Sequence, residues 1–332
     1  MTARDILSIV VLIALAALVP LATSASTVLN FLVFMLIIAL GAQGWNILGG
    51  FGGQFSFGHA AFFGTGAYAT AILQLRYGIN AWVGLGPAVA AGAVVGWVIG
   101  FLSFRSGLRG SYFALVTLAF AEVLRILANA TAFTGGAAGL LIKLDVRPEN
   151  LQFENRAVFY WVVLGFVGAV LLLTRWIQRS RFGAQLVAVR ENEDAAKALG
   201  VDSLRVKLRA ITLSAGITAL AGCLYAQYFL YIDANIAYGT WISIEFLLAP
   251  IIGGVGTVFG PLAGALTLHG LGELTKAFAG RIPGIDLIVF GTVLVLAIAF
   301  APGGILGLLG RLRAKGAGLL PAGSKEVSHA GR

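Results

Sequence analysis

Few side chains in this sequence could take part in chemistry, and most of them lie inside apolar runs. Glu245 stands in an apolar stretch with no cation within one turn, and Glu122 lies three residues before Arg125, a spacing that allows an ion pair on one helical face. The three histidines have no ligand-type spacing and Cys223 is the only cysteine, so we predict neither a metal site nor a disulfide. Such ionisable groups suit the polar lining of a pathway through a membrane. The alternative is that Glu122 and Arg125 lie near the outer end of their span and extend to the interface, and that Glu245 has a cap or interface role.

The composition indicates the class of protein that must position these residues. The chain has 332 residues, of which 59% are hydrophobic and 11% charged, whereas soluble domains usually carry about 25% charged residues. The formal net charge of +9 does not indicate nucleic-acid binding, because the positive residues cluster at 175–209 and 311–315, beside apolar runs. There they set the membrane topology and contact anionic lipid.

We therefore predict an all-α, polytopic membrane protein with about ten membrane-spanning helices, some of them glycine-broken or re-entrant. Positive charge in the loops 105–110 and 179–209 places these loops and both termini in the cytoplasm, and the neutral loop 131–156 outside. We interpret 1–310 as the transmembrane domain and 311–332 as a basic, disordered tail. The first run could be a signal peptide, but we favour a retained helix. The predicted spans are 6–22, 28–48, a third ending near 75, 81–104, 111–130, 157–174, 210–232, 241–256, 261–278 and 287–301.

A glycine-dense stretch follows the second span. Glycines 49, 50, 52 and 53 disfavour a continuous helix, and non-helical backbone in a bilayer is tolerated where it is buried in protein or faces a water-filled cavity. We predict that 49–56 lines or gates a solute pathway, with Gln54 facing the cavity and Ser56 beside it. The alternative is that the glycines only permit tight helix packing. His59 fits a packing hydrogen bond better than a substrate contact. A weak internal repeat relates 49–52 to 253–256.

The polar segment 179–209 separates two apolar stretches. Within it we predict one amphipathic helix over 184–199, with Leu186, Val189, Ala196 and Leu199 on one face. Gly200 should end this helix, and Asp202 or Ser203 should cap the next one. The helix is either a connector on the lipid headgroups or a docking element for a soluble partner. For docking, residues 190–194 would form an exposed edge that offers charge-assisted contacts, and the apolar face would offer an anchor.

Five blocks of the sequence resemble the permeases of branched-chain amino acid ABC importers, and the length and the long neutral loop resemble those of the M-type subunit. In this family the resemblance implies that segment 179–209 couples transport to ATPase subunits. The blocks are GGFGGQFSFGHAAFFGTGAYATAIL (49–73), SGLRGSYFALVTLAFAEVLR (106–125) with FTGGAAGL (133–140), the segment 180–226, IIGGVGTVFGPLAGA (251–265) and FAPGGILG (300–307). Ala137 and Ala138 depart from the polar pair expected after FTGG.

The resemblance also implies partners and a substrate class. The partners are a homologous H-type permease, two ATPase subunits that bind ATP and Mg²⁺, a periplasmic amino-acid-binding protein and membrane lipid; the chain itself would be no enzyme and bind no cofactor. It would lie in the bacterial inner membrane. Alternatives are a permease for urea, short amides, aromatic acids or sugars, or a secondary transporter. The candidate coupling residues are Arg190, Glu191, Asn192, Glu193, Asp194, Ala195, Leu199 and Gly200, and the candidate pathway residues are Gly52, Gly53, Gln54, Ser56, His59, Thr134, Gly135, Gly136 and Glu245.

Overall fold

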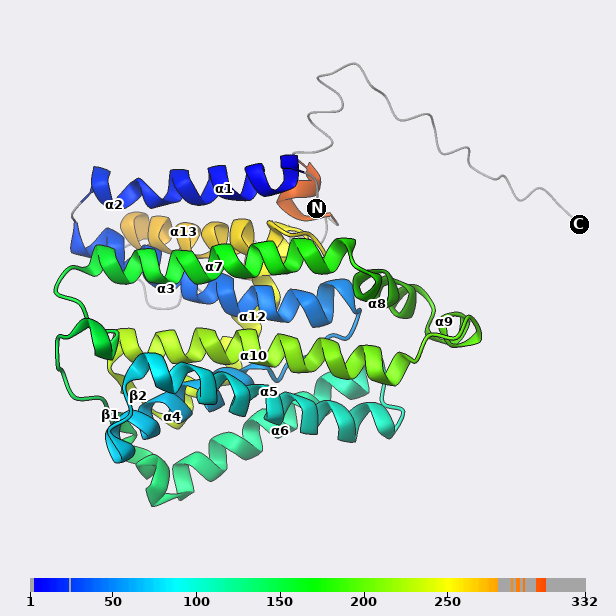
Figure 1. The fold of residues 1–332 in the computed structure, drawn as a ribbon, viewed down its shortest axis with the longest axis horizontal. Helices are drawn as coiled ribbons and strands as arrows, with labels where there is room; N and C mark the ends of the chain where they lie inside the picture. The colour runs from blue at the N-terminus through cyan, green and yellow to red at the C-terminus, as the bar shows by residue number, and fades with distance from the viewer. Residues whose placement is uncertain are drawn as a thin grey trace, which may run out of the picture.

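A computed structural model describes residues 3–23, 25–279, 288, 291–292, 295 and 303–308 of the chain. Its long helices run roughly side by side in one bundle (Figure 1). The elements are α1 (Ala3–Ala17), α2 (Val19–Ala22), α3 (Ser26–Trp45), the π-helix η1 (Asn46–Phe51), α4 (His59–Tyr77), α5 (Ala81–Arg105), α6 (Gly110–Ala130), the 3-10 turns η2 (Ala132–Thr134), η3 (Gly136–Ala138) and η4 (Pro148–Asn150), β1 (Leu140–Leu141), α7 (Arg156–Arg179), α8 (Arg181–Glu191), α9 (Glu193–Ala198), α10 (Ser203–Phe229), β2 (Tyr231–Ile232), α11 (Ala234–Ala237), α12 (Thr240–Gly253) and α13 (Gly260–Ala279).

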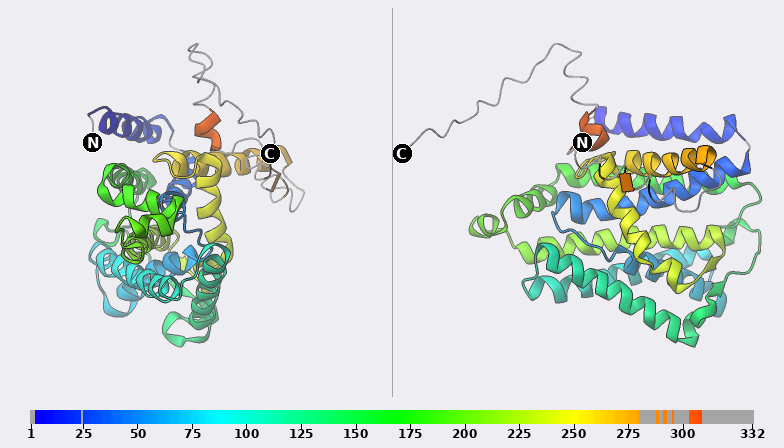
Figure 2. Two further views of the ribbon diagram at one scale, coloured as in Figure 1. Left: turned by 90° about the vertical axis from the view of Figure 1, so that its right-hand side faces the viewer. Right: turned by 180° about the vertical axis from the view of Figure 1, so that it is seen from behind.

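Helix α10 lies at the centre of the bundle and packs against α3, α4 and α5. Small residues allow this close approach: a Cβ on Gly96 of α5 would lie 2.3 Å from the Ala215 side chain, and one on Gly66 of α4 would lie 2.1 Å from the Ala219 carbonyl oxygen. In a bilayer such contacts hold helices together by van der Waals packing, because lipid tails are as apolar as the side chains. Figure 2 shows α6 at the margin of the bundle, while α12 crosses it at a steep angle.

The two ends of the bundle differ. At one, α8 and α9 project beyond the long helices; we call this the α8–α9 end (Figure 1). At the other, β1 and β2 form a short antiparallel pair that joins the 131–156 loop to the end of α10, with Leu140 opposite Ile232; we call this the β1–β2 end. The long helices run between these two ends (Figure 1).

The prediction of an all-α polytopic membrane protein is confirmed. Among the described residues, six helical segments are long and apolar enough to cross a membrane, and 6–22 is a shorter apolar helix. Helices α4 and α13 also occupy predicted spans, whereas most of 287–301 lies outside the described residues, so the count of ten stays a prediction. The six segments are Ser26–Phe51, Ala81–Arg105, Gly110–Ala130, Arg156–Arg179, Ser203–Phe229 and Ala234–Gly253.

Three details of the expected helices are wrong. The single helix over 184–199 is two helices, because Asn192 is extended (φ −157°, ψ 105°) and caps α9 with its side chain. The glycines at 49 and 50 do not break α3, which continues as the π-helix η1 to Phe51 before the chain leaves helical geometry at 52–58. Helix α7 runs on to Arg179 instead of ending near 174. Gly200 (φ +85°) does follow α9, and Asp202 does cap α10, as predicted.

Candidate functional site

The glycine-dense stretch meets the polar segment at the α8–α9 end. The guanidinium of Arg190 on α8 donates from Nη1 to the carbonyl oxygen of Gly50, at 3.0 Å. Gly53 adopts φ +66°, and a Cβ there would lie 2.5 Å from Cγ of Arg190. Only glycine meets both conditions without strain. The two segments chosen from the sequence for different roles, one for the pathway and one for coupling, therefore touch.

The second glycine segment joins the same place. The Asn46 side chain of η1 donates to the Thr257 carbonyl oxygen at 2.9 Å and accepts from the Gly256 amide at 2.8 Å. A Cβ on Gly50 would lie 2.7 Å from the Gly256 nitrogen. The two similar glycine segments are thus neighbours in space. Each includes the end of a helix, η1 or α12, and precedes the next long helix, α4 or α13, which is the arrangement that the repeat hypothesis requires.

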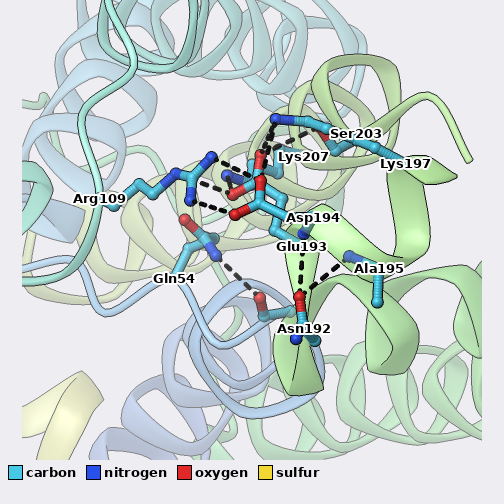
Figure 3. Close-up of polar contacts among 10 residues, drawn as sticks. Gln54, Arg109, Asn192, Glu193, Asp194, Ala195, Lys197, Ser203 and Lys207 are labelled. Atoms are coloured by element: carbon cyan, nitrogen blue, oxygen red, sulfur yellow. Dashed lines mark hydrogen bonds and ion pairs between the residues drawn. The ribbon is translucent and has the colours of Figure 1, made fainter.

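A cluster of charged side chains fixes α9 to the bundle (Figure 3). Glu193, the first residue of α9, accepts from Lys207 of α10 at 2.5 Å, from the Ser203 hydroxyl at 3.0 Å and from Lys197 at 3.1 Å. Arg109, between α5 and α6, lies 3.3 Å from Glu193 and 3.2 Å from Asp194. We call these residues the Glu193 cluster. It connects the α5–α6 loop, α9 and the start of α10 through one carboxylate.

The electrostatics of the Glu193 cluster follow from its geometry. Burial by itself would raise the pKa of Glu193, but the hydrogen bonds from Lys207, Lys197 and Ser203 outweigh it and lower the pKa to about 2. The Glu193 side chain is 14% exposed and the Lys207 side chain 5%. Glu193 is therefore ionised throughout the neutral range, and it neutralises a lysine that has little access to water.

The predicted docking edge over 190–194 is only partly exposed. Glu191 and Asp194 have side chains 67% and 74% exposed, whereas Glu193 faces inward, so its expected place on an exposed edge is wrong. Asn192 accepts from the Asp194 and Ala195 amides, which makes it the cap that orients α9. Figure 3 shows Asn192 at the start of α9 with its hydrogen bonds to the two amides.

The apolar face predicted for this segment is also divided. Leu186, Val189 and Ala196 are buried against the bundle, so they do not offer an apolar anchor to a partner. Leu199 is 86% exposed at the end of α9, next to Gly200, so the prediction that all four residues share one face is wrong. The break at Asn192 rotates α9 relative to α8, and this leaves one large apolar side chain projecting from the tip of the loop.

The candidate pathway residues near 52–59 lie at the α8–α9 end. Gln54 is half-buried and donates from Nε2 to the Gly52 carbonyl oxygen at 3.1 Å. His59 is fully buried, with Nε2 2.8 Å from the Ser214 hydroxyl and Nδ1 3.2 Å from the Ser56 hydroxyl. Since Ser214 donates to the Gly44 carbonyl oxygen, it must accept from Nε2 of His59. This is the geometry of a hydrogen bond that packs helices.

The other candidate pathway residues lie elsewhere. Thr134, Gly135 and Gly136 form the turn that ends α6 at the β1–β2 end; the Thr134 hydroxyl is 2.6 Å from the Ala128 carbonyl oxygen. Glu245 is buried within α12, with Oε1 3.7 Å from Nε2 of His269 on α13. The structure therefore distributes the predicted set over both ends and the middle of the bundle, and does not gather it into one site.

Several residues of this site were missed in the sequence. Arg109, Ser203 and Lys207 drew attention only as loop charges or a cap, and Asn46 is one polar residue at the end of an apolar run. A polar side chain three or four residues before a glycine cluster was the available signal for Asn46. The partners of Glu193 carried no such signal, because Arg109 lies 84 residues before Glu193 and Lys207 lies 14 residues after it.

Comparison with known proteins identifies the family of this chain. A sequence model described as "Branched-chain amino acid transport system / permease component" matches residues 27–298. The chain belongs to this permease family. The match includes both glycine segments and all of α8, α9 and α10, so the site lies within the part that the family shares.

Individual relatives agree with the M-type resemblance. The chain is 32% identical over 297 residues to the high-affinity branched-chain amino acid transport system permease protein LivM of Salmonella typhimurium, covering 82% of this chain and 68% of that protein. It is 29% identical over 272 residues to the probable branched-chain amino acid transport permease protein LivM of Methanocaldococcus jannaschii, covering 75% and 77%. The permease protein LivH of Escherichia coli is 25% identical over 286 residues, covering 81% and 91%. The likeness to M-type subunits is therefore confirmed.

Proposed function

We propose that this chain is the M-type permease subunit of an ABC importer that moves branched-chain amino acids into the cytoplasm. It pairs with a homologous H-type permease, and each permease contributes part of a pathway that opens alternately to each side of the inner membrane. The observation that carries the proposal is the match over residues 27–298, together with relatives whose names specify this transport. ATP and Mg²⁺ bind to partner subunits, and this chain performs no catalysis.

The orientation belongs to the same proposal. The α8–α9 end carries Arg105, Arg109 and Arg179 in addition to the charges of α8 and α9, whereas positive and negative residues balance in the 131–156 loop. Positive charge in short loops favours the cytoplasmic side. The α8–α9 end would then face the cytoplasm with both termini and the 311–332 tail, and the ten spans would place the β1–β2 end toward the periplasmic binding protein.

The α8–α9 segment is the proposed docking site of the ATPase. Leu199 offers an apolar anchor at the tip, and the exposed carboxylates of Glu191 and Asp194 offer charge-assisted contacts. The Glu193 cluster holds α9 rigidly on α10, and α10 packs on α3, α4 and α5. A movement imposed on α9 would therefore reach the helices that carry the glycine segments.

Reconstitution tests both parts of the proposal. The chain, co-expressed with its H-type partner, ATPase subunits and receptor, should accumulate leucine in proteoliposomes only with ATP; uptake of urea, an aromatic acid or a sugar in its place would assign the alternative substrates. ATP-independent uptake coupled to a proton gradient would establish a secondary transporter.

The docking site has its own variant and control. Leu199→Ser should weaken ATPase co-purification about 30-fold, since loss of an interface anchor costs roughly 2 kcal/mol. Leu141→Ser, at an apolar residue 72% exposed at the opposite end, should leave it unchanged. Equal co-purification of both variants with the ATPase would make the α8–α9 segment a connector.

A further inference from the structure

Helix α6 carries a polar flank that neither the docking site nor the glycine segments use. Glu122, Arg125 and Asn129 follow one another at helical spacing along it. Arg125 donates from Nε to Glu122 at 2.9 Å and from Nη2 to its second oxygen at 2.5 Å, and Nη1 lies 2.6 Å from the Asn235 side chain of α11. The ion pair thus links a membrane-spanning helix to the short helix beside it.

The depth of this pair makes its exposure costly in lipid. At 1.5 Å per residue, Arg125 and Glu122 lie about 8 and 12 Å from the end of α6 at Ala130, within a helix about 31 Å long. Their side chains are 29% and 44% exposed in the isolated chain. Arg125 turns Nε and Nη2 toward Glu122, one turn deeper, and Nη1 toward Asn235 of α11. Ionisable residues at such depth face protein or water.

The lipid-facing surface of α6 is a different one. Its large exposed side chains are apolar and lie along one side of the helix; they are Tyr112, Leu115, Val123, Ile126 and Leu127. This stripe is typical of contact with lipid tails. Arg125 lies to one side of it, toward α11, where it meets the Asn235 side chain, and Glu122 is its partner on α6. One helix therefore presents an apolar surface and a charged surface side by side.

The pair has unused hydrogen-bonding capacity. A guanidinium has five N–H donors, and Arg125 uses three of them on Glu122 and Asn235, so two remain. The Glu122 carboxylate offers about four acceptor positions and uses two with Arg125. A free amino acid has the complementary groups, a carboxylate that accepts and an ammonium group that donates. Both could bind without separating the pair.

We propose that this flank of α6, together with Asn235 of α11, lines the solute pathway and binds a zwitterionic amino acid, with its carboxylate on Arg125 and its ammonium group on Glu122. The inference rests on the proposed amino-acid transport and names the residues that would receive the solute inside the membrane. The inference also means that this flank is the side of α6 that faces water, because water in the pathway must hydrate the charges of Glu122 and Arg125 when no solute is bound.

Accessibility to a hydrophilic reagent tests the placement. Leu118→Cys lies one turn from Glu122 on the polar flank, about 12 Å from the nearer end of α6. Val123→Cys lies about 10.5 Å from the opposite end, on the apolar stripe, where Val123 is 50% exposed. The native Cys223 is buried, so it adds little background. In the assembled complex a methanethiosulfonate ethyltrimethylammonium reagent should modify Leu118→Cys about tenfold faster or more, because only the polar flank meets water. Equal rates, or an unreactive Leu118→Cys in every state of the cycle, would overturn the placement.

Uptake by charge variants tests the binding. Glu122→Gln and Arg125→Gln should each lower the rate of leucine uptake about tenfold or more, with normal assembly, because each removes a charge-assisted contact to the solute. The double variant should be at least as impaired. A purely structural ion pair gives the opposite result, since removing both charges leaves no unpaired charge and should restore uptake. Restored uptake in the double variant therefore refutes the binding role.

The two proposals can fail separately. Leucine with its receptor should slow modification of Leu118→Cys in a complex that hydrolyses ATP; an unchanged rate in a complex that does transport leucine would refute the amino-acid contact at this flank. Wild-type complex that takes up no leucine would instead refute the proposed function, and the contrast between Leu118→Cys and Val123→Cys would still report which side of α6 is wet.

Discussion

Neutralising Glu193 should loosen α9 from the bundle without unfolding the long helices. Glu193→Gln keeps the size of the side chain but removes the charge that Lys207, Lys197 and Arg109 share. Lys207 is 5% exposed, so it would be left with little compensation. Removing one partner of a charged hydrogen bond costs about 1.5–3 kcal/mol, and roughly 2 kcal/mol is reasonable here because Glu193 is not wholly buried.

Hydrogen exchange of the α9 amides measures this cost directly. A loss of about 2 kcal/mol in local opening raises the exchange rate about 30-fold, while the amides of α3 and α10 should keep wild-type rates. Glu191→Gln is the matched control: its side chain is 67% exposed and pairs with Arg190, so we expect a change of about 0–1 kcal/mol. Glu193→Gln combined with Lys207→Met should recover part of the protection, because no lone charge remains.

One result would refute the reasoning about the Glu193 cluster. If Glu193→Gln and Glu191→Gln exchange at the same rate, the cluster contributes nothing to the position of α9. The Asn192 cap and the short connection from α9 to α10 would then be enough to position α9.

The remaining predictions concern pH, backbone, topology and the pathway. Because the pKa of Glu193 is lowered to about 2, the protection of the α9 amides from hydrogen exchange should be constant from pH 7 to 5. It should fall as the pH drops through about 4.5 toward 2, when the carboxylate takes up a proton, and Glu193→Gln should lack this pH dependence. Gly53→Ala should destabilise the protein by more than the roughly 1 kcal/mol that a left-handed backbone costs a non-glycine residue, because the added methyl group also meets Arg190. Gly78→Ala, at φ +63° with open space around it, should cost only this backbone strain. Equal thermal shifts of the two variants would contradict the contact between residue 53 and Arg190. Asn192→Cys should react only from the cytoplasmic side and Asn150→Cys only from the periplasmic side, and reaction of both from one side would exclude the proposed orientation. Gln54→Leu should assemble normally but lower uptake, and full uptake would reduce 49–56 to helix packing.

The sequence by itself determined the class of protein and the limits of most helices. Apolar runs separated by short polar segments define membrane spans almost independently of tertiary contacts, because backbone in lipid must satisfy its own hydrogen bonds. Thus α5 begins at Ala81, as predicted, and α6 begins at Gly110, one residue before its predicted start at 111. The caps at Asp202 and Gly200 were also readable, since they depend on neighbours within a few residues.

The tertiary structure alone decided what the polar residues do. Glu193 was expected on an exposed edge and faces inward, and Leu199 was expected on one face with Leu186 and lies apart from it, because the break at Asn192 turns α9 toward Arg109 and Lys207. The contact between the two glycine segments through Asn46 joins residues about 210 positions apart. A pattern read over one or two turns cannot contain such pairings, since they are set by how α3, α10 and α12 pack and not by the order of residues within any of them.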